Sequence, residues 1–323
     1  MKSSASYKII SITIKVAILL VALWFLYRQI FVKHDFKGIS EYYKSIWLKR
    51  DSVLVSLLFL LMLFNWGLEA LKWKLMVAKI EKISFYKSIE SVFAGITVSF
   101  FTPNRVGEFG GRIFFLEKAD RVEAALISIF GGMSQLLVTL TAGSIALVYF
   151  LNKYVLLDPG FYIFVVAMLL VALVVLYVIF FNISLLYKLA ERFVFLKKYT
   201  HYVKPLELFS KAEIGRIVIL SAIRYMIFTL QYWLMLRMMD VPLPLLPAIT
   251  MISMTYLVMS VPTFALTEFG LRSVVAVQFI GILSANSLGI ISSSFSVYLL
   301  NVAFPALLGA FFVFNLKFFR NAK

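Results

Sequence analysis

Long apolar stretches, broken by short polar segments, make up most of the chain. A helix needs about 20 apolar residues to cross the ~30 Å hydrocarbon core of a bilayer. About six stretches reach that length, so the pattern predicts an all-α polytopic membrane protein with a single membrane domain over residues 1–323. The six predicted spans are 9–31, 53–77, 124–151, 160–181, 214–236 and 295–316.

The first apolar stretch has two interpretations. Residues 1–31 combine a basic start with an apolar body, as a signal peptide does, but the stretch ends in Trp24, Tyr27 and Arg28 and offers no small-residue cleavage site. We therefore expect a retained first span. The aromatic, mixed segment 36–50 that follows is predicted to lie in the membrane interface.

Two further apolar stretches are short and end near prolines. Residues 84–101 lead to Pro103 and residues 248–261 lead to Pro262, and the chain then turns polar again. We expect each stretch to enter the membrane, break, and leave on the same side as a re-entrant helical hairpin. Such backbone is tolerated at membrane depth where protein or a wet cavity surrounds it. Residues 284–294 are predicted to form a loop of small residues.

A five-residue pattern, E-F-G-x-R, follows both prolines. Its copies occupy residues 108–112 and 268–272, so they lie 160 residues apart (268 minus 108). Chance is one explanation in so apolar a chain, but similar elements precede both copies, which favours an internal repeat. The predicted halves cover about 53–151 and 212–316, with the span 9–31 before them and the span 160–181 and a cytoplasmic loop 182–211 between them.

Basic residues predict the orientation, because Lys and Arg are enriched in cytoplasmic loops. With both termini in the cytoplasm, the basic residues of 72–87, 182–211 and 317–323 all lie there. The two hairpins then open on opposite sides, which makes the repeat inverted. That is the arrangement of transporters that bind substrate near the membrane midplane. The basic residues of 33–50 oppose this orientation, and we assign them to the interfacial segment.

Composition narrows the class of protein and its partners. Hydrophobic residues make up 62% of the chain and charged residues only 15%, against roughly 25% charged in a typical soluble domain. The net charge of +16 fits basic residues that flank membrane helices and attract anionic lipid, so nucleic acid is not an expected partner. Cysteine is absent and the two histidines lie in polar connections, so we expect no metal site and no cofactor.

Charged residues inside apolar stretches are the candidates for chemistry. Each costs roughly 3 kcal/mol at the bilayer centre on the insertion scale, so we expect them to line a polar cavity. In each E-F-G-x-R copy the acid and the arginine are four residues apart, so they lie on one face of a helix. Two internal ion pairs are one interpretation, and the other is a head-group site that uses backbone amides freed after each proline. The candidate site residues are Arg105, Glu108, Arg112, Arg224, Glu268 and Arg272, with Pro103, Gly107, Gly110, Pro262 and Gly270 as helix breakers and hinges.

Other polar residues occur within the predicted spans. Arg224 has no acid three or four residues away on its own helix, so we expect Glu268 or a lipid phosphate as its partner. Glu69 lies beside Lys72 and Trp73, which favours a place near the interface over a role in the cavity. Interhelical hydrogen bonds are expected from Asn65, Gln135 and Gln231.

The motifs carry a resemblance to a known family. T-P-N-R-V-G-E-F-G-G-R, residues 102–112, resembles the P-x-R-x-G-E-x-x-R signature of the lysylphosphatidylglycerol synthase transmembrane family. That family includes the flippase half of bacterial multiple peptide resistance factors and stand-alone inner-membrane proteins. The second copy is similar to a glycine-rich family element, but Phe264, Ala265 and Leu266 stand where glycines are expected.

The resemblance implies lipid translocation or lipid-linked transport in the bacterial cytoplasmic (inner) membrane. It assigns the first half-site to Pro103, Arg105, Gly107, Glu108 and Arg112. It also implies that this chain, which lacks the aminoacyl-transferring domain of the two-part proteins, does not synthesise lysyl lipid.

Three functions fit these observations. The leading hypothesis is a flippase-like transporter of a phospholipid or lipid-linked substrate, passive or ion-coupled, with Glu108 and Glu268 as candidate proton carriers. The alternative is a lipid-linked glycosyl or phosphoryl transferase, although Asp35, Asp158 and Asp240 are isolated rather than clustered. A non-catalytic partner of a lipid or glycan synthase is the third. We expect that the protein is not an enzyme. We also expect it to form a homo-oligomer or to associate with a synthase partner.

Overall fold

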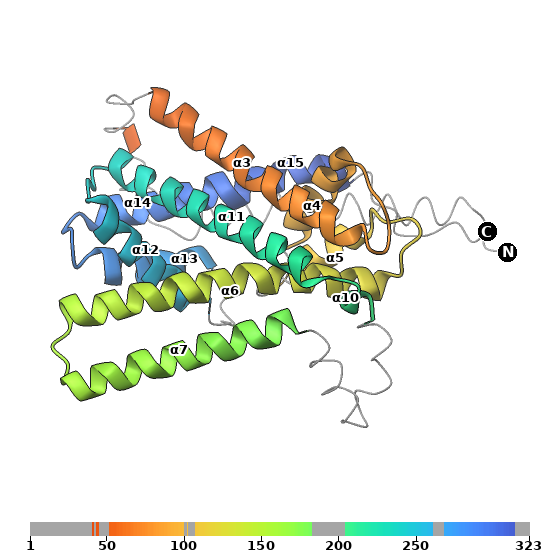
Figure 1. Ribbon diagram of the computed structural model, residues 1–323. Coiled ribbons are helices and arrows are strands. Elements are labelled where there is room, and N and C mark those ends of the chain that lie inside the picture. Colours follow the sequence, from red (N-terminus) through yellow and green to blue (C-terminus); the bar gives the residue numbers. More distant parts are fainter. Residues whose placement is uncertain are drawn as a thin grey trace.

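The computed structural model describes residues 41, 43, 44, 52–99, 102, 107–182, 204–260 and 268–313, with side chains at all of these except 204 and 268–270. Every regular element within these ranges is a helix, which confirms the all-α membrane fold (Figure 1). The elements are α3 (Ser52–Val77), α4 (Phe85–Ser99), α5 (Gly107–Ile113), α6 (Arg121–Tyr154), α7 (Pro159–Phe181), α10 (Lys204–Glu207), α11 (Lys211–Met238), α12 (Leu245–Met259), α13 (Glu268–Ile280), α14 (Ser287–Tyr298), the π-helix η4 (Leu299–Ala303) and α15 (Phe304–Val313).

Five helical segments of the described residues are long and apolar enough to cross a membrane. They are α3, α6, α7, α11 and the continuous run of α14, η4 and α15. The first four match the predicted spans to within three residues at each end. The predicted span 9–31 and most of the predicted interfacial segment lie outside the described residues.

The prediction of a loop over residues 284–294 is wrong, because α14 begins at Ser287. The Asn286 side chain accepts a hydrogen bond from the Gly289 amide and so caps the helix. Ser293 donates to the Gly289 carbonyl and Ser296 to the Ser292 carbonyl, so these hydroxyls are satisfied within the helix. Small residues therefore extend the last predicted span at its start rather than interrupt it.

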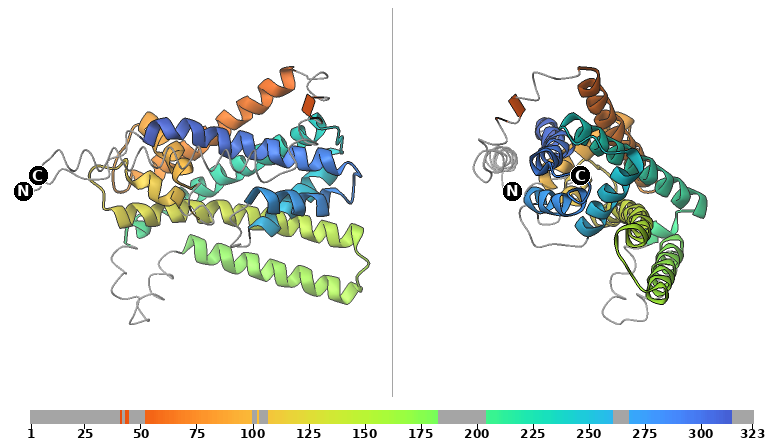
Figure 2. Two further views of the ribbon diagram at one scale, coloured as in Figure 1. Left: turned by 180° about the vertical axis from the view of Figure 1, so that it is seen from behind. Right: turned by 90° about the vertical axis from the view of Figure 1, so that its left-hand side faces the viewer.

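The helices form an elongated bundle in which α3 and α11 pack against each other, while α7 lies at the edge alongside α6 (Figures 1 and 2). α4 packs against α5 and α15, and α12 packs against α13 and α6. Along the chain, a long helix, two short helices and a further span occur twice, as α3–α4–α5–α6 and as α11–α12–α13 followed by the α14–η4–α15 run. α4 and α12 match in position as well, since 245 minus 85 and 259 minus 99 both give 160.

Glycine permits the close approach of α4 and α5. A Cβ atom built on Gly111 would lie 2.6 Å from the Cα atom of Gly95, and a Cβ on Gly95 would lie 2.8 Å from the Glu108 carbonyl oxygen. Ser91 Oγ donates to the Arg112 carbonyl at 3.0 Å and joins the two helices. These contacts hold the first E-F-G-x-R copy, which forms most of α5, against α4.

A carboxylate outside the spans joins the segment between α3 and α4 to the turn before α6. Glu81, after α3, accepts hydrogen bonds from the backbone amides of Glu117, Lys118 and Ala119 just before α6. Partial burial favours the protonated acid, but these amides and nearby Lys87 favour the carboxylate more, so the pKa of Glu81 lies below its ordinary value. The loop before α4 and the turn before α6 are therefore fastened at one end of the bundle.

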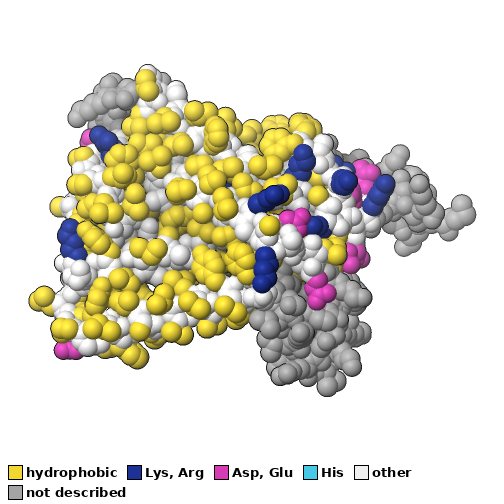
Figure 3. Space-filling view, viewed as in Figure 1, with side chains coloured by type: hydrophobic (Ala, Val, Ile, Leu, Met, Phe, Trp, Pro, Cys, Tyr) yellow, Lys and Arg dark blue, Asp and Glu magenta, His cyan; other side chains and the backbone are white. Residues whose placement is uncertain are grey.

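Charged side chains gather at that same end of the molecule. In Figure 3 the face over the helices is mainly hydrophobic, and most Lys, Arg, Asp and Glu side chains lie where α3 ends and α6 and α11 begin. An apolar body with charge at its ends suits a bilayer.

Candidate functional site

Glu69 is the centre of a buried charge cluster inside the bundle. Its side chain extends from α3 and the residue is only 4% exposed. Oε1 accepts from Arg112 Nη1 at 2.7 Å, and Oε2 accepts from Lys72 Nζ at 3.0 Å and from Arg224 Nη1. One carboxylate on α3 therefore joins cations from α3, α5 and α11.

Arg112 connects the first E-F-G-x-R copy to this centre. Nη2 donates to Glu108, four residues earlier on α5, so the first copy contains the internal ion pair of the first interpretation. The guanidinium lies 5.8 Å from the centre of the Trp73 ring, and the residue is 4% exposed. Among the described residues its Nε has no hydrogen-bond partner. Arg112 thus combines two ion pairs with one unused buried donor.

Lys72 is the most deeply buried cation of the cluster, at 1% exposed. Besides Glu69, its ammonium donates to the Gly131 carbonyl at 3.1 Å and to Ser221 Oγ at 3.3 Å. Ser221 in turn is hydrogen-bonded to Ser134 at 2.8 Å. The three donors of the ammonium each have an acceptor, which fixes α6 and α11 to α3 at this level.

Arg224 binds Glu69, a partner that the sequence did not indicate. Glu268, one of the two partners that we expected, has no described side chain, and the described contacts place the guanidinium between α3 and α6. Nε donates to the Asn65 side-chain oxygen at 3.0 Å, and Nη1 also donates to Gln135 Oε1 at 3.3 Å. Sequence reasoning could not find Glu69, because the two residues lie 155 positions apart.

The network continues beyond Arg224 through neutral side chains. Asn65 donates to Asn301 Oδ1 at 3.3 Å, Asn301 donates to Gln231 Oε1 at 3.0 Å, and Gln231 donates to the Leu58 carbonyl at 2.8 Å. These bonds confirm the interhelical hydrogen bonds predicted for Asn65 and Gln231. The prediction for Gln135 is confirmed by its bonds to Arg224 and Ser221 on α11. Asn301 was not predicted. It lies in η4, a π-helical turn followed closely by Pro305, and such turns are frequent at functional sites.

Three cations and two carboxylates among the described residues form the cluster. Lys72, Arg112 and Arg224 are three cations, and Glu69 and Glu108 are two carboxylates, so the five side chains together carry a formal charge of +1. Removing charges from water is costly, and buried ions are tolerated when paired and hydrogen-bonded. The cluster therefore gathers five charged side chains in a part of the bundle where an unpaired charge would be expensive.

The predicted site residues have different outcomes. Glu108, Arg112 and Arg224 converge on Glu69, and Gly107 and Gly110 lie on α5 with Glu108 and Arg112. Arg272, on α13, is half-buried and close enough to Tyr232 and Tyr256 to interact electrostatically with both. Outside the described residues, or with undescribed side chains, are Arg105, Pro103, Pro262, Glu268 and Gly270.

Two residues of the cluster were misjudged from the sequence. Glu69 and Lys72 were expected near an interface, but both are buried among α3, α6 and α11. The sequence did contain an indication of their role. An acid and a base three positions apart in an apolar stretch have the same free-energy cost of membrane insertion as the charged residues of the repeat. Among the described residues, no group of three or more His, Cys, Asp and Glu is placed to hold a metal ion.

Comparison with known proteins identifies the family. The model of the family described as the lysylphosphatidylglycerol synthase TM region matches residues 12–309. No curated protein and no solved structure matches the chain. The matched region includes every residue of the cluster and both E-F-G-x-R copies, which confirms the resemblance seen in the motifs.

Proposed function

The chain belongs to the lysylphosphatidylglycerol synthase TM family, and from this premise we propose that it moves the anionic head group of a phospholipid or lipid-linked substrate across the membrane, as a flippase does. The family match itself makes the chain an integral membrane protein linked to lipid handling. The observation that carries the proposal is the buried cluster around Glu69, which brings two arginines and a lysine together inside the bundle.

A phosphate group is the ligand that this cluster suits. Five charges in the membrane interior cost on the order of 10 kcal/mol before pairing, and the described side chains of the cluster include one more cation than carboxylates. Arg112 supplies a buried Nε donor with no partner among the described residues. Arginine binds phosphate oxygens through two parallel hydrogen bonds, so an anionic head group would accept from this unused donor and from a neighbouring guanidinium nitrogen.

The cluster is closed in this arrangement, so transport requires an opening. The α4–α5 and α12–α13 pairs are the elements we propose to act as re-entrant hairpins in an inverted repeat. Their support is the shared element order, the common offset of 160 residues for α4 and α12, and the packing of each on a helix of the other half, α4 on α15 and α12 on α6. A head group would compete with Glu108 for Arg112 as α5 moves relative to α3.

We propose the bacterial cytoplasmic membrane as the location, with both termini in the cytoplasm. The end of the bundle that carries Lys79, Lys87 and Arg121 would face the cytoplasm by the positive-inside rule. Val313, at the end of α15, packs in one cluster with Phe115, just before α6, so the chain leaves α15 on this side. α3 starts at the opposite end, and one span before it would return the amino terminus to the cytoplasm.

Reconstitution into liposomes tests the proposal. Phosphatidylglycerol with a fluorescent acyl chain is placed in both leaflets, and dithionite quenching reports how fast the inner pool reaches the outer leaflet. Arg112→Gln should slow this exchange by roughly tenfold or more, since it removes charge-assisted hydrogen bonds of about 1.5–3 kcal/mol each. Arg112→Lys keeps the charge without the planar fork and should retain intermediate activity.

Arg216→Gln is the matched control, because Arg216 is an exposed arginine on α11 outside the cluster. Its exchange rate should equal that of the unaltered protein. A folded Arg112→Gln protein that moves the lipid at the full rate would exclude the mechanism. Product formation from a lipid-phosphate donor, without exchange, would favour the transferase alternative.

A further inference from the structure

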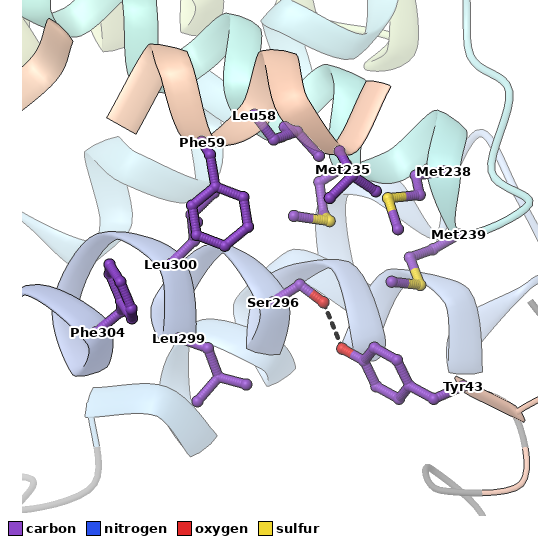
Figure 4. Close-up of a pocket in the computed structure, with 11 residues that line it drawn as sticks. Tyr43, Leu58, Phe59, Met235, Met238, Met239, Ser296, Leu299, Leu300 and Phe304 are labelled. Carbon is purple, nitrogen blue, oxygen red and sulfur yellow. Dashed lines mark hydrogen bonds between the residues drawn. The ribbon is translucent and has the colours of Figure 1, made fainter. Parts of the chain in front are cut away.

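An apolar groove of about 330 Å³ lies between α3, α11 and the α14–η4–α15 run, next to the end of the polar network. Figure 4 shows it from the side, with Phe59 and Phe304 at one end and Tyr43 at the other. The Phe59 and Phe304 rings meet edge to face with centroids 5.8 Å apart. Side chains that form its walls include Leu58, Phe59, Met235, Met238, Leu299 and Leu300.

The lining leaves nothing for a polar ligand to bind. Its hydroxyl groups belong to Tyr43 and Ser296, and these are hydrogen-bonded to each other (Figure 4). Each also reaches the same backbone oxygen, since Tyr43 donates to the Ser292 carbonyl at 3.0 Å and Ser296 does so at 2.9 Å. Water needs two to four polar partners to occupy a cavity. The ligand that suits this groove is therefore a hydrocarbon.

We propose that the groove binds an acyl chain of the phospholipid whose head group the cluster recognises. This rests on the proposed function for the identity of the lipid. The walls are membrane-spanning helices, so the groove opens among hydrocarbon chains. Polar molecules do not suit this void, whereas an acyl chain would give the side chains that line it the dispersion contacts that they otherwise lack.

The polar network connects this groove to the head-group cluster. Leu58 forms part of the wall, and its carbonyl accepts the last hydrogen bond of the network, from Gln231. Asn301 is adjacent to Leu300, another wall residue, and both lie in η4. Along α3 the distance from Leu58 to Glu69 is ~16 Å of helix rise. A single lipid can therefore place its phosphate at the cluster and a chain in the groove.

The π-helical turn forms the wall nearest the network. Leu299, Leu300 and Phe304 all line the groove, and η4 supplies the first two of them. The same turn presents Asn301 to Asn65 and Gln231. One irregular turn thus separates the apolar binding surface from the polar one, and this gives η4 a role in positioning the lipid.

Photo-crosslinking in nanodiscs tests the groove directly. The full-length protein is reconstituted with phosphatidylglycerol that carries a diazirine at the end of one acyl chain, irradiated, and mapped by mass spectrometry. Adducts are expected on peptides that contain Met235, Met238, Leu299 and Phe304. Met238→Trp and Leu299→Trp fill the groove from two half-buried positions and should each lower these adducts several-fold.

Leu63→Trp is the control, because Leu63 is an exposed residue of α3 outside the groove. The amount of lipid adduct in the groove of the Leu63→Trp protein should equal that in the unaltered protein. Equal labelling of all lipid-facing helices, insensitive to both groove variants, would overturn the inference.

Failure of the inference and failure of the proposed function give different results. Groove adducts in a protein that does not exchange lipid in liposomes would support an acyl-chain site and overturn the transport proposal. Exchange that depends on Arg112, together with an unlabelled groove, would support transport and overturn the acyl-chain site.

Discussion

Replacing Glu69 by Gln should destabilise the protein more than any other single removal of a carboxylate from the described residues. Glutamine keeps the shape of the side chain but removes the charge that Arg112, Lys72 and Arg224 share. The cluster changes from three cations and two carboxylates to three cations and one, so its formal charge rises from +1 to +2. Removing one partner of a buried pair typically costs about 3–5 kcal/mol, and this site has three pairs.

Unfolding in mixed micelles gives the measurement. The free energy of unfolding is followed by tryptophan fluorescence as the SDS fraction rises, and Trp66 and Trp73 report on the site, since they lie 5.5 Å from Arg224 and 5.8 Å from Arg112. We expect a loss of at least about 3 kcal/mol for Glu69→Gln. Glu207→Gln, a change at an exposed carboxylate of α10, should stay within about 0.5 kcal/mol.

A double variant separates the charge effect from simple loss of packing. Lys72→Met in the Glu69→Gln background removes the cation whose described ion pair is with Glu69, and it returns the formal charge of the five side chains to +1. Its loss of stability should be smaller than the sum of the two single losses by about 1–3 kcal/mol, because the residues are in contact. A Glu69→Gln loss below about 1 kcal/mol, or strictly additive losses, would refute the view that Glu69 holds the cluster together.

Two further predictions concern the elements around the site. Gly111→Ala should destabilise the protein by about 1–3 kcal/mol, because the new Cβ would lie 2.6 Å from the Gly95 Cα. Gly110→Ala is the control: its Cβ meets nothing within 4 Å, so this change should be neutral or stabilising by up to about 1 kcal/mol. Equal unfolding midpoints for the two variants in the same micelle assay would contradict the packing argument. Glu81 has a lowered pKa when folded, so its contribution to stability is present above its unfolded pKa near ~4.3 and is lost as the pH falls toward the lower folded value. Melting temperatures measured between about pH 7 and 3 should therefore fall less steeply for Glu81→Gln than for the unaltered protein, and parallel curves would show that the three backbone amides do not hold a carboxylate.

The sequence alone was enough for the fold class and for most of the helix boundaries. Membrane helices are decided locally, since a run of about 20 apolar residues must satisfy its own backbone hydrogen bonds inside hydrocarbon. Four predicted spans agree with the structure to within three residues at each end. The Glu108–Arg112 pair was also predictable, because both residues lie on one helix four positions apart. The start of α14 was not, because capping by Asn286 and hydrogen bonds within the helix satisfy a serine-rich stretch that looks like a loop.

The identity of the central residue was decided only by tertiary structure. Glu69 stands 43 positions from Arg112 and 155 from Arg224, and nothing in the local pattern selects it as the acid that joins them. The same is true of Asn301, which reaches Asn65 across 236 positions through an irregular turn of its helix. Hydrophobic pattern determines which segments enter a membrane, because each segment makes that choice by itself. Which charges then meet depends on how separate helices pack, and that is a property of the whole bundle.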